Sequence, residues 1–169
     1  MKEVLSDAVI ADFLRRSYFT VDGLWFVKLE QLHGFDEAMD MDEAVWKVMS
    51  KIQARKAKSL LGIEEGSLQE LARAFQLKFA AEGYDYRVES EESEVRIIVE
   101  KCPWYEILKS SGRTSIAEPI ADRICALEFA GWAHEFAEPI EFQMRKRLCV
   151  EKDNCDRCEF AFLSAKSSS

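Results

Sequence analysis

The sequence predicts an α+β fold in which a helical N-terminal half packs on an antiparallel sheet of about four strands. Three observations lead to this fold class. Apolar residues recur at helical spacing as far as Gly83. From Tyr84 onward they alternate with polar residues, which is the period of a half-buried strand. One helical segment interrupts the alternating part, so the order expected after the first helices is β-β-α-β-β.

Two helices and the beginning of a third are expected in the first 42 residues. Ser6 can cap the first helix and Thr20 the second, because a side-chain oxygen at this position accepts a bond from an unpaired amide. Gly34 is suited to the left-handed conformation that ends a helix. Asp40 or Asp42 would begin the third helix.

The third helix is expected to end near Gly62, and a fourth to run from Ser67 to Gly83. Ser67 and Glu70 have the spacing of a capping box, in which each residue bonds the backbone of the other. The third helix also carries a run of basic residues with no acid among them. A solvated helix face explains such a run most simply, and a surface for an anion or acidic partner is the alternative. The run consists of Lys47, Lys51, Arg55, Lys56 and Lys58.

The C-terminal half contains the expected strands. Residues 84–88 and 95–99 alternate and would be joined by a polar hairpin loop. A helix should begin between Ser115 and Pro119 and run to about Phe136, since proline is tolerated in a first turn. Residues 140–150 and 158–162 alternate again and predict the last two strands.

The helical region 1–83 and the cysteine-containing region 84–163 should together form one compact domain, with residues 164–169 as a disordered tail. The core is expected to draw on apolar residues from both regions. Those residues are Trp25, Val48, Phe75, Ile97, Val99, Ile124, Phe142, Phe160 and Phe162.

Composition limits the classes of partner. The chain has 169 residues and a net charge of −8, which disfavours non-specific binding to nucleic acid. No apolar run approaches the ~20 residues that span a bilayer. The first residues carry acids where a secretory signal would be basic and then apolar, so a cytoplasmic protein is expected. The expected partner is a small molecule, with no nucleic acid and no membrane, and a homodimer is left open.

Five cysteines are the main functional clue in the sequence. An odd number cannot pair completely within one chain, and a cytosolic compartment keeps thiols reduced. The cysteines could therefore fill the core, supply a reactive thiol or bind a metal. Strand parity places Cys158 on the inner face with Phe160 and Phe162.

The spacing of Cys155 and Cys158 is that of two thiolates that chelate one ion from a tight turn. A complete tetrahedral site needs two more ligands, and Cys102 and Cys125 are the candidates, with Cys149 as a substitute for Cys155. Thiolates outnumber imidazoles here, which favours an iron–sulfur cluster or a structural zinc.

A catalytic site around Cys125 is the alternative hypothesis to a metal site. Asp122 and Glu128 lie three residues to either side, so one of them could share its helix face and handle protons. A carboxylate also raises the pKa of a neighbouring thiol, and Arg123 or Arg113 would have to offset this. His134 is nine residues from Cys125, which places it about 180° away on a helix and excludes a cysteine–histidine pair.

Short motifs give a resemblance to a known family. Cys102-Pro103, Ile124-Cys125 and the strand 158–162 resemble the L-2-amino-thiazoline-4-carboxylic acid hydrolase-like family and, distantly, the 4-vinyl reductase-type ligand-binding domain. The resemblance implies hydrolysis of a cyclic C–N bond. Cys125 or Cys102 would then be the nucleophile or bind the substrate, and Asp122 or Glu128 would move the proton.

The chain departs from that family before the last strand. Residues 152–157 replace a Gly-Asp pair, and Cys149 and Cys155 are additional thiols, which favours a metal-bearing relative. The competing hypothesis is a non-enzymatic ligand-binding or sensory module whose cysteines hold a metal or fill the core. Thiol reactivity separates the two, because a catalytic thiol reacts quickly near neutral pH and a structural one does not.

Overall fold

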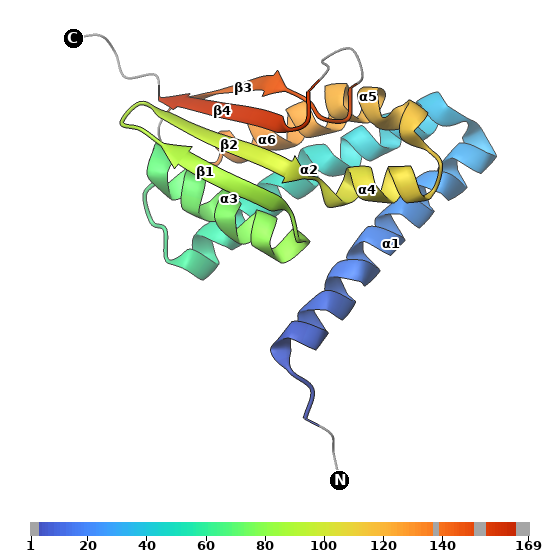
Figure 1. Ribbon diagram of the computed structural model, residues 1–169, viewed down its shortest axis with the longest axis horizontal. Coiled ribbons are helices and arrows are strands. Elements are labelled where there is room, and N and C mark those ends of the chain that lie inside the picture. Colours follow the sequence, from blue (N-terminus) through green and yellow to red (C-terminus); the bar gives the residue numbers. More distant parts are fainter. Residues whose placement is uncertain (1–3, 137–138, 151–154, 165–169) are drawn as a thin grey trace. The chain divides into compact units, whose positions relative to one another are not determined.

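The protein is described by a computed structural model, which covers residues 4–136, 139–150 and 155–164 (Figure 1). The chain divides into two compact units, Met1–Asp42 and Glu43–Ser169. Helix α2, Phe35–Leu61, belongs to both units. The second unit contains the sheet, the remaining helices and all five cysteines. None of the helices described is long and apolar enough to cross a membrane.

The first unit contains one long helix where two were expected. Helix α1 runs from Asp7 to His33, and Ser6 caps it by accepting a bond from the amide of Val9. The predicted helix start at Thr20 is wrong, because that residue lies inside α1. No proline interrupts this stretch, and an isolated Gly23 costs a helix only about 1 kcal/mol.

The turn between α1 and α2 is a single residue. Gly34 has φ 95° and ψ 168°, a positive φ that favours glycine but lies outside the left-handed helical region we expected. Helix α2 begins directly at Phe35, so the predicted start at Asp40 or Asp42 is wrong. The amide of Ala38 bonds the carbonyl of Gly34, which starts the helix before either aspartate.

Helix α3, Leu68–Glu82, begins and ends as predicted. Ser67 accepts a bond from the amide of Glu70, and the Glu70 side chain accepts one from the amide of Ser67, which is the complete capping box. Gly83 ends the helix in the left-handed conformation, with φ 77° and ψ 34°. This sharp ending leads the chain directly into the sheet.

Four antiparallel strands form the sheet, in the order β1-β2-β4-β3. The strands are β1 Asp85–Ser90, β2 Glu94–Lys101, β3 Ile140–Lys146 and β4 Cys158–Ser164. The α+β class and the order β-β-α-β-β are confirmed. Strand β3 ends four residues earlier than expected, so Leu148, Cys149 and Val150 follow it in a turn. Of the expected tail, Ser164 is the last residue of β4, and 165–169 lie outside the described residues.

The connection between β2 and β3 holds one helix that we did not expect and one that we did. Helix α4, Pro103–Ser110, directly follows β2, with proline at its first turn. The expected helix then follows as a run of short helical segments, including a π-helical turn that ends at Cys125. These segments are η1 Thr114–Ile116, α5 Ala117–Ile120, η2 Ala121–Cys125 and α6 Ala126–Ala133.

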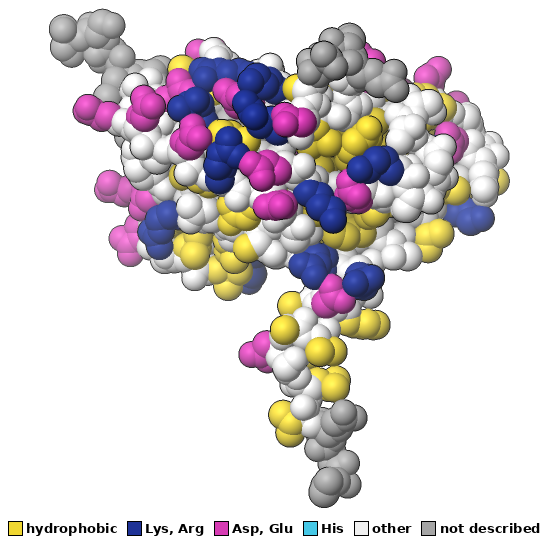
Figure 2. Space-filling view, in the orientation of Figure 1, with side chains coloured by type: hydrophobic (Ala, Val, Ile, Leu, Met, Phe, Trp, Pro, Cys, Tyr) yellow, Lys and Arg dark blue, Asp and Glu magenta, His cyan; other side chains and the backbone are white. Residues whose placement is uncertain are grey.

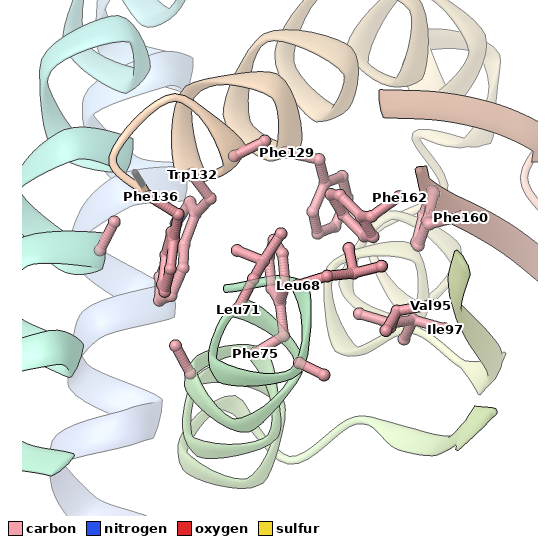
Figure 3. Packing of buried hydrophobic residues seen from close by; sticks show 14 of the residues in the cluster. Leu68, Leu71, Phe75, Val95, Ile97, Phe129, Trp132, Phe136, Phe160 and Phe162 are labelled. Atoms are coloured by element: carbon pink, nitrogen blue, oxygen red, sulfur yellow. The ribbon is translucent and has the colours of Figure 1, made fainter. Parts of the chain in front are cut away.

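An aromatic core lies between the inner face of the sheet and helices α3 and α6 (Figure 3). Phe75 of α3 contacts Trp132 and Phe162 with ring centroids 4.9 Å apart in both pairs. The ring centroid of Phe129 in α6 lies 4.3 Å from that of Phe160 in β4. Of the residues predicted for the core, those confirmed as buried are Phe75, Ile97, Val99, Ile124, Phe160 and Phe162.

Three core predictions differ from the structure. Phe142 is only partly buried but packs against the core. Val48 is 57% exposed, because α2 turns its opposite face, with Ala54 and Ala57, towards the core. Trp25 is 67% exposed, and the buried positions of α1 are the neighbouring Phe26 and the more distant Phe19. Apolar spacing alone does not show which face of α1 or α2 is buried.

The outer face of the sheet is charged rather than apolar. Figure 2 shows acidic and basic side chains intermixed over the strands. A guanidinium nitrogen of Arg96 lies 2.8 Å from a carboxylate oxygen of Glu89 across the β1–β2 hairpin. A guanidinium nitrogen of Arg145 in β3 lies 2.7 Å from a carboxylate oxygen of Glu94 in β2. Exposed pairs of this kind contribute little stability each, but their alternation explains the period of two in the sequence.

Candidate functional site

Three charged side chains are buried together at one end of the aromatic core. Lys78 and Glu82 lie one turn apart on α3, and Glu128 projects from α6. The Lys78 nitrogen lies 2.7 Å from Glu82 Oε1 and 2.9 Å from Glu128 Oε1, and each side chain is at most 7% exposed. We call these three residues the ion cluster. With one cation and two anions, its formal charge is −1.

Two aromatic residues adjoin the ion cluster. The indole Nε1 of Trp104 donates a hydrogen bond to Glu82 Oε2 at 3.4 Å. The same indole packs edge-on against Trp46 of α2, with centroids 5.8 Å apart. The Tyr84 ring lies 5.9 Å from the Lys78 nitrogen, within the range of a cation–π contact. The ion cluster therefore links α3, α6 and the start of α4.

The electrostatics of Lys78 follow from this arrangement. Burial disfavours the ammonium ion and by itself lowers its pKa, but the charges of Glu128 and Glu82 and the hydrogen bonds to them outweigh burial. The pKa of Lys78 is therefore raised above its ordinary value. Lys78 stays charged at neutral pH and is committed to its two carboxylates.

Cys102 adjoins the same region, at the junction where β2 ends and α4 begins. Burial raises the pKa of its thiol and the charge of Glu82 adds to this, while the amides of Tyr105 and Trp104 and the side chain of Tyr84 favour the thiolate. Burial dominates, so the pKa is raised. Tyr84 responds in the same way, because burial and the nearby Cys102 raise the pKa of its phenol well above the ordinary value.

Cys125 and Cys158 are further thiols of this region. Burial raises the pKa of Cys125 well above its ordinary value, and Cys102 and Glu128 raise it further. Burial also raises the pKa of Cys158, whose sulfur accepts a bond from the amide of Leu148 at 3.4 Å. The thiolate is the nucleophilic form of cysteine, so burial keeps these thiols in the unreactive form at neutral pH.

The residues predicted for catalysis separate into two places. Glu128 lies in the ion cluster, close enough to Cys125 to raise its pKa. Asp122 instead points to the surface, where it forms an ion pair with Arg147. Asp122 is therefore not a partner of Cys125, although both are on the π-helical turn.

Of the thiols predicted as metal ligands, Cys158 lies in the core and Cys102 and Cys125 pack against it, while Cys149 and Cys155 are partly exposed. After burial, Cys102, Cys149 and Cys158 each raise the pKa of Cys125, and Cys102, Cys149 and Cys155 each raise that of Cys158. Cys155 donates a hydrogen bond to the Arg157 carbonyl at 3.3 Å, within its own loop. Within residues 4–136, 139–150 and 155–164, no three side chains of His, Cys, Asp or Glu are arranged to hold a metal ion. The zinc or iron–sulfur site therefore stays a prediction without structural support.

The sequence pattern points to Glu128 and the thiols. It does not point to Lys78, Glu82, Tyr84 or Trp104. A signal for the first two was present. On α3 the buried positions include Leu71 and Phe75, and continuing at helical spacing reaches Lys78 and Glu82. Charged residues in register with an apolar helix face predict a buried ion pair. Trp104 lies on helix α4, which the sequence does not predict, so its contact with Glu82 could not be inferred from the sequence.

The basic run on α2 has a partly structural role. Arg55 Nε lies 2.6 Å from Oε2 of Glu135, a residue just beyond α6. The Lys58 ammonium group donates a hydrogen bond to the backbone carbonyl of Glu135 at 3.0 Å. Lys58 also lies 5.1 Å from the centre of the Phe136 ring. These two cations bind the end of α6 to α2, so they belong to the fold.

Comparison with known proteins places the chain in a family. Residues 2–162 match the model of a family of unknown function, DUF6125. The chain belongs to DUF6125. No curated protein matches this DUF6125 chain.

The fold of the DUF6125 protein is similar to that of a solved structure. That structure is a trafficking protein particle complex subunit 3 from Naegleria fowleri, covalently bound to palmitic acid. The identity is 14% and the TM-score 0.55, and the match covers 95% of the DUF6125 chain and 98% of the subunit. At this identity the likeness establishes a shared fold.

Proposed function

We propose that this protein is a non-enzymatic module that binds an apolar chain with an uncharged head, such as a fatty alcohol or an acyl ester. The ligand would lie where Cys102, Cys125 and Tyr84 pack against the aromatic core, with its head at the ion cluster. The observation that carries the proposal is that Cys102 and Cys125 are partly buried and pack against the aromatic core, where burial raises the pKa of both thiols. Such an apolar setting suits a binding site better than nucleophilic catalysis.

The class of ligand is inferred from two sources. The subunit that shares this fold over nearly its whole length is bound to palmitic acid, which makes an acyl chain the first candidate. The ion cluster then limits the head group. Its formal charge of −1 lies in a buried setting, where repulsion of a second anion is strong. A free carboxylate is therefore disfavoured, and a hydroxyl or ester is accepted.

The experiment is a titration of the full chain with a fluorescent fatty alcohol and displacement by unlabelled acid, alcohol and ester of equal chain length. The alcohol and ester should displace the probe at least about tenfold more effectively than the acid, which corresponds to ~1.4 kcal/mol. Glu128→Gln makes the cluster formally neutral and should reduce this preference. Glu106→Gln removes an exposed carboxylate that pairs with Lys109, and it should leave the preference unchanged.

Two results would overturn the proposal. One is the absence of displaceable binding by any of the three ligands in the folded chain. The other is turnover: hydrolysis of amino-thiazoline carboxylate that is lost in Cys125→Ser would favour the hydrolase that the sequence motifs suggested.

A further inference from the structure

The turn that ends helix α3 holds the Tyr84 side chain in one place, where the chain passes from α3 into β1 (Figure 1). The amide of Gly83 donates a hydrogen bond to the carbonyl of Ala80 at 3.3 Å, and Gly83 is in the left-handed conformation. The amide of Tyr84 donates one to the carbonyl of Phe79 at 3.0 Å. These bonds form a Schellman motif, which commonly brings the residue after the glycine against the side chain five positions earlier. The Tyr84 ring accordingly packs edge-on against Phe79, with centroids 4.6 Å apart.

The hydroxyl of Tyr84 donates a hydrogen bond to the sulfur of Cys102, at the junction of β2 and α4. Sulfur is a weak hydrogen-bond acceptor. Burial raises the pKa of the Tyr84 phenol well above its ordinary value, so the hydroxyl carries its proton at neutral pH. Tyr84 therefore presents a protonated donor, beside the core, whose bond to Cys102 is weak.

Two further donors adjoin the ion cluster, and both are bonded to charged groups. The ammonium nitrogen of Lys78 lies within 2.9 Å of an oxygen of Glu82 and of one of Glu128. The indole of Trp104 donates to the second oxygen of Glu82. A hydrogen bond to an ionised acceptor is roughly twice as strong as one between neutral groups. A ligand oxygen would compete with carboxylates at these two donors, whereas at Tyr84 it competes with a thiol.

We propose that the Tyr84 hydroxyl recognises the head of the bound ligand, by exchanging the sulfur of Cys102 for an oxygen of the ligand. This inference rests on the proposed function and adds the requirement that the uncharged head accepts a hydrogen bond. A hydroxyl or an ester carbonyl meets this requirement, and a halide or hydrocarbon end does not. The ion cluster disfavours an anionic head, and Tyr84 selects among the uncharged heads.

Displacement of a fluorescent fatty alcohol from the full chain tests this selection. The competitors are an unlabelled alcohol and the 1-chloroalkane of equal length, and the affinity of the probe is measured for each variant. Tyr84→Phe keeps the ring and its contact with Phe79 but removes the donor. It should weaken binding of the alcohol by about tenfold, because the hydroxyl of the ligand is left unpaired in a buried setting. Binding of the chloroalkane should not change.

Tyr86→Phe is the matched control. The Tyr86 ring also packs against Phe79, with centroids 5.2 Å apart, and its hydroxyl donates to the carbonyl of Gln76 at 3.1 Å. The substitution removes a phenol hydroxyl from the same aromatic group, so it should leave the dissociation constants of both competitors unchanged. Circular dichroism checks that both variants are folded.

Cys102→Ala tests the exchange itself, because it removes the acceptor that competes with the ligand. The alcohol should bind about threefold more tightly relative to the chloroalkane, since the Tyr84 hydroxyl no longer gives up a bond. Tyr84→Phe combined with Cys102→Ala should abolish this gain. A gain that persists without the Tyr84 hydroxyl would overturn the exchange.

The outcomes separate this inference from the proposed function. If both competitors bind but Tyr84→Phe weakens them equally, or leaves the alcohol unaffected, the role of Tyr84 is wrong and the proposed binding stands. A loss in Tyr86→Phe as large as that in Tyr84→Phe would overturn the role of Tyr84 as well. If neither the probe nor the competitors bind the wild-type chain, the proposed function fails and the role of Tyr84 fails with it.

Discussion

The ammonium nitrogen of Lys78 lies 2.7 Å from Glu82 Oε1, and neither side chain is more than 7% exposed. Burying ions costs several kcal/mol each unless they are paired, so these side chains depend on one another and on Glu128. The ion cluster connects α3 to α6 beside the thiols. Stability and the proposed binding thus rely on the same residues.

Lys78→Met should destabilise the protein strongly. The substitution leaves Glu82 and Glu128 buried without a cation, and breaking a buried pair in this way costs about 3–5 kcal/mol. The free energy of unfolding in urea measures the loss. Lys109→Met removes an exposed lysine paired with Glu106 and should cost less than about 1 kcal/mol. Equal losses in the two variants would contradict a buried ion cluster.

The thiols should differ in their reaction with iodoacetamide in the native state. Cys158 is buried and Cys102 and Cys125 are partly buried, and burial raises the pKa of all three thiols, so their thiolate fraction is low. Cys155 lies in the loop before β4 and should react first. Peptide mass spectrometry at successive times gives the order. Rapid modification of Cys125 at neutral pH would instead indicate a catalytic thiol.

Stability should fall as the pH rises above about 9. The thiols of Cys102 and Cys125 have an ordinary pKa of 9.0 and the phenol of Tyr84 one of 10.0, and burial raises all three in the folded chain. The unfolded chain therefore loses these protons first, and alkaline pH favours it. The stabilisation is complete below the unfolded values and is lost above them.

Urea unfolding at pH 7.5 and pH 10 measures this pH dependence. Cys125→Ala removes one of the shifted groups and should reduce the difference between the two pH values, while Cys155→Ala is the control. The same free energy of unfolding at both pH values in the wild-type chain would show that the thiols are not buried as described.

Gly131→Ala tests the close approach of α6 to α2. A Cβ at position 131 would lie 2.5 Å from Ser50 Oγ and 3.2 Å from Ser50 Cβ, and Ser50 is fully buried. The clash should cost about 1–3 kcal/mol, which exceeds the gain in helix propensity of up to about 1 kcal/mol. Gly23→Ala, with nothing within 4 Å, should be neutral or stabilising. Thermal unfolding of both variants distinguishes these outcomes.

Local rules predicted the fold well where the signal lay within a few residues. The capping box at Ser67, the helix end at Gly83 and the alternation in β2 and β4 were all readable from neighbours in the sequence. The sequence did not distinguish the two apolar faces of α2, because Val48 and Ala54 are equally compatible with a core. That distinction depends on which face α3 and α6 cover.

The candidate site was predictable only in part, for a related reason. Cys125 and Glu128 are neighbours on one helix, so their association could be inferred. The contact of Lys78 with Glu128 joins positions fifty residues apart, and no local pattern encodes it. Asp122 was equally close in sequence to Cys125, but its pairing with Arg147 at the surface depends on where β3 ends.

The most direct test of the proposed function is native mass spectrometry of the freshly purified chain, followed by denaturation and extraction of any bound molecule. The proposal predicts a complex heavier than the polypeptide by the mass of one apolar chain with an uncharged head, released on denaturation and depleted in Lys78→Met. A native mass equal to that of the polypeptide alone, in protein that also fails to take up added fatty alcohol, would contradict it.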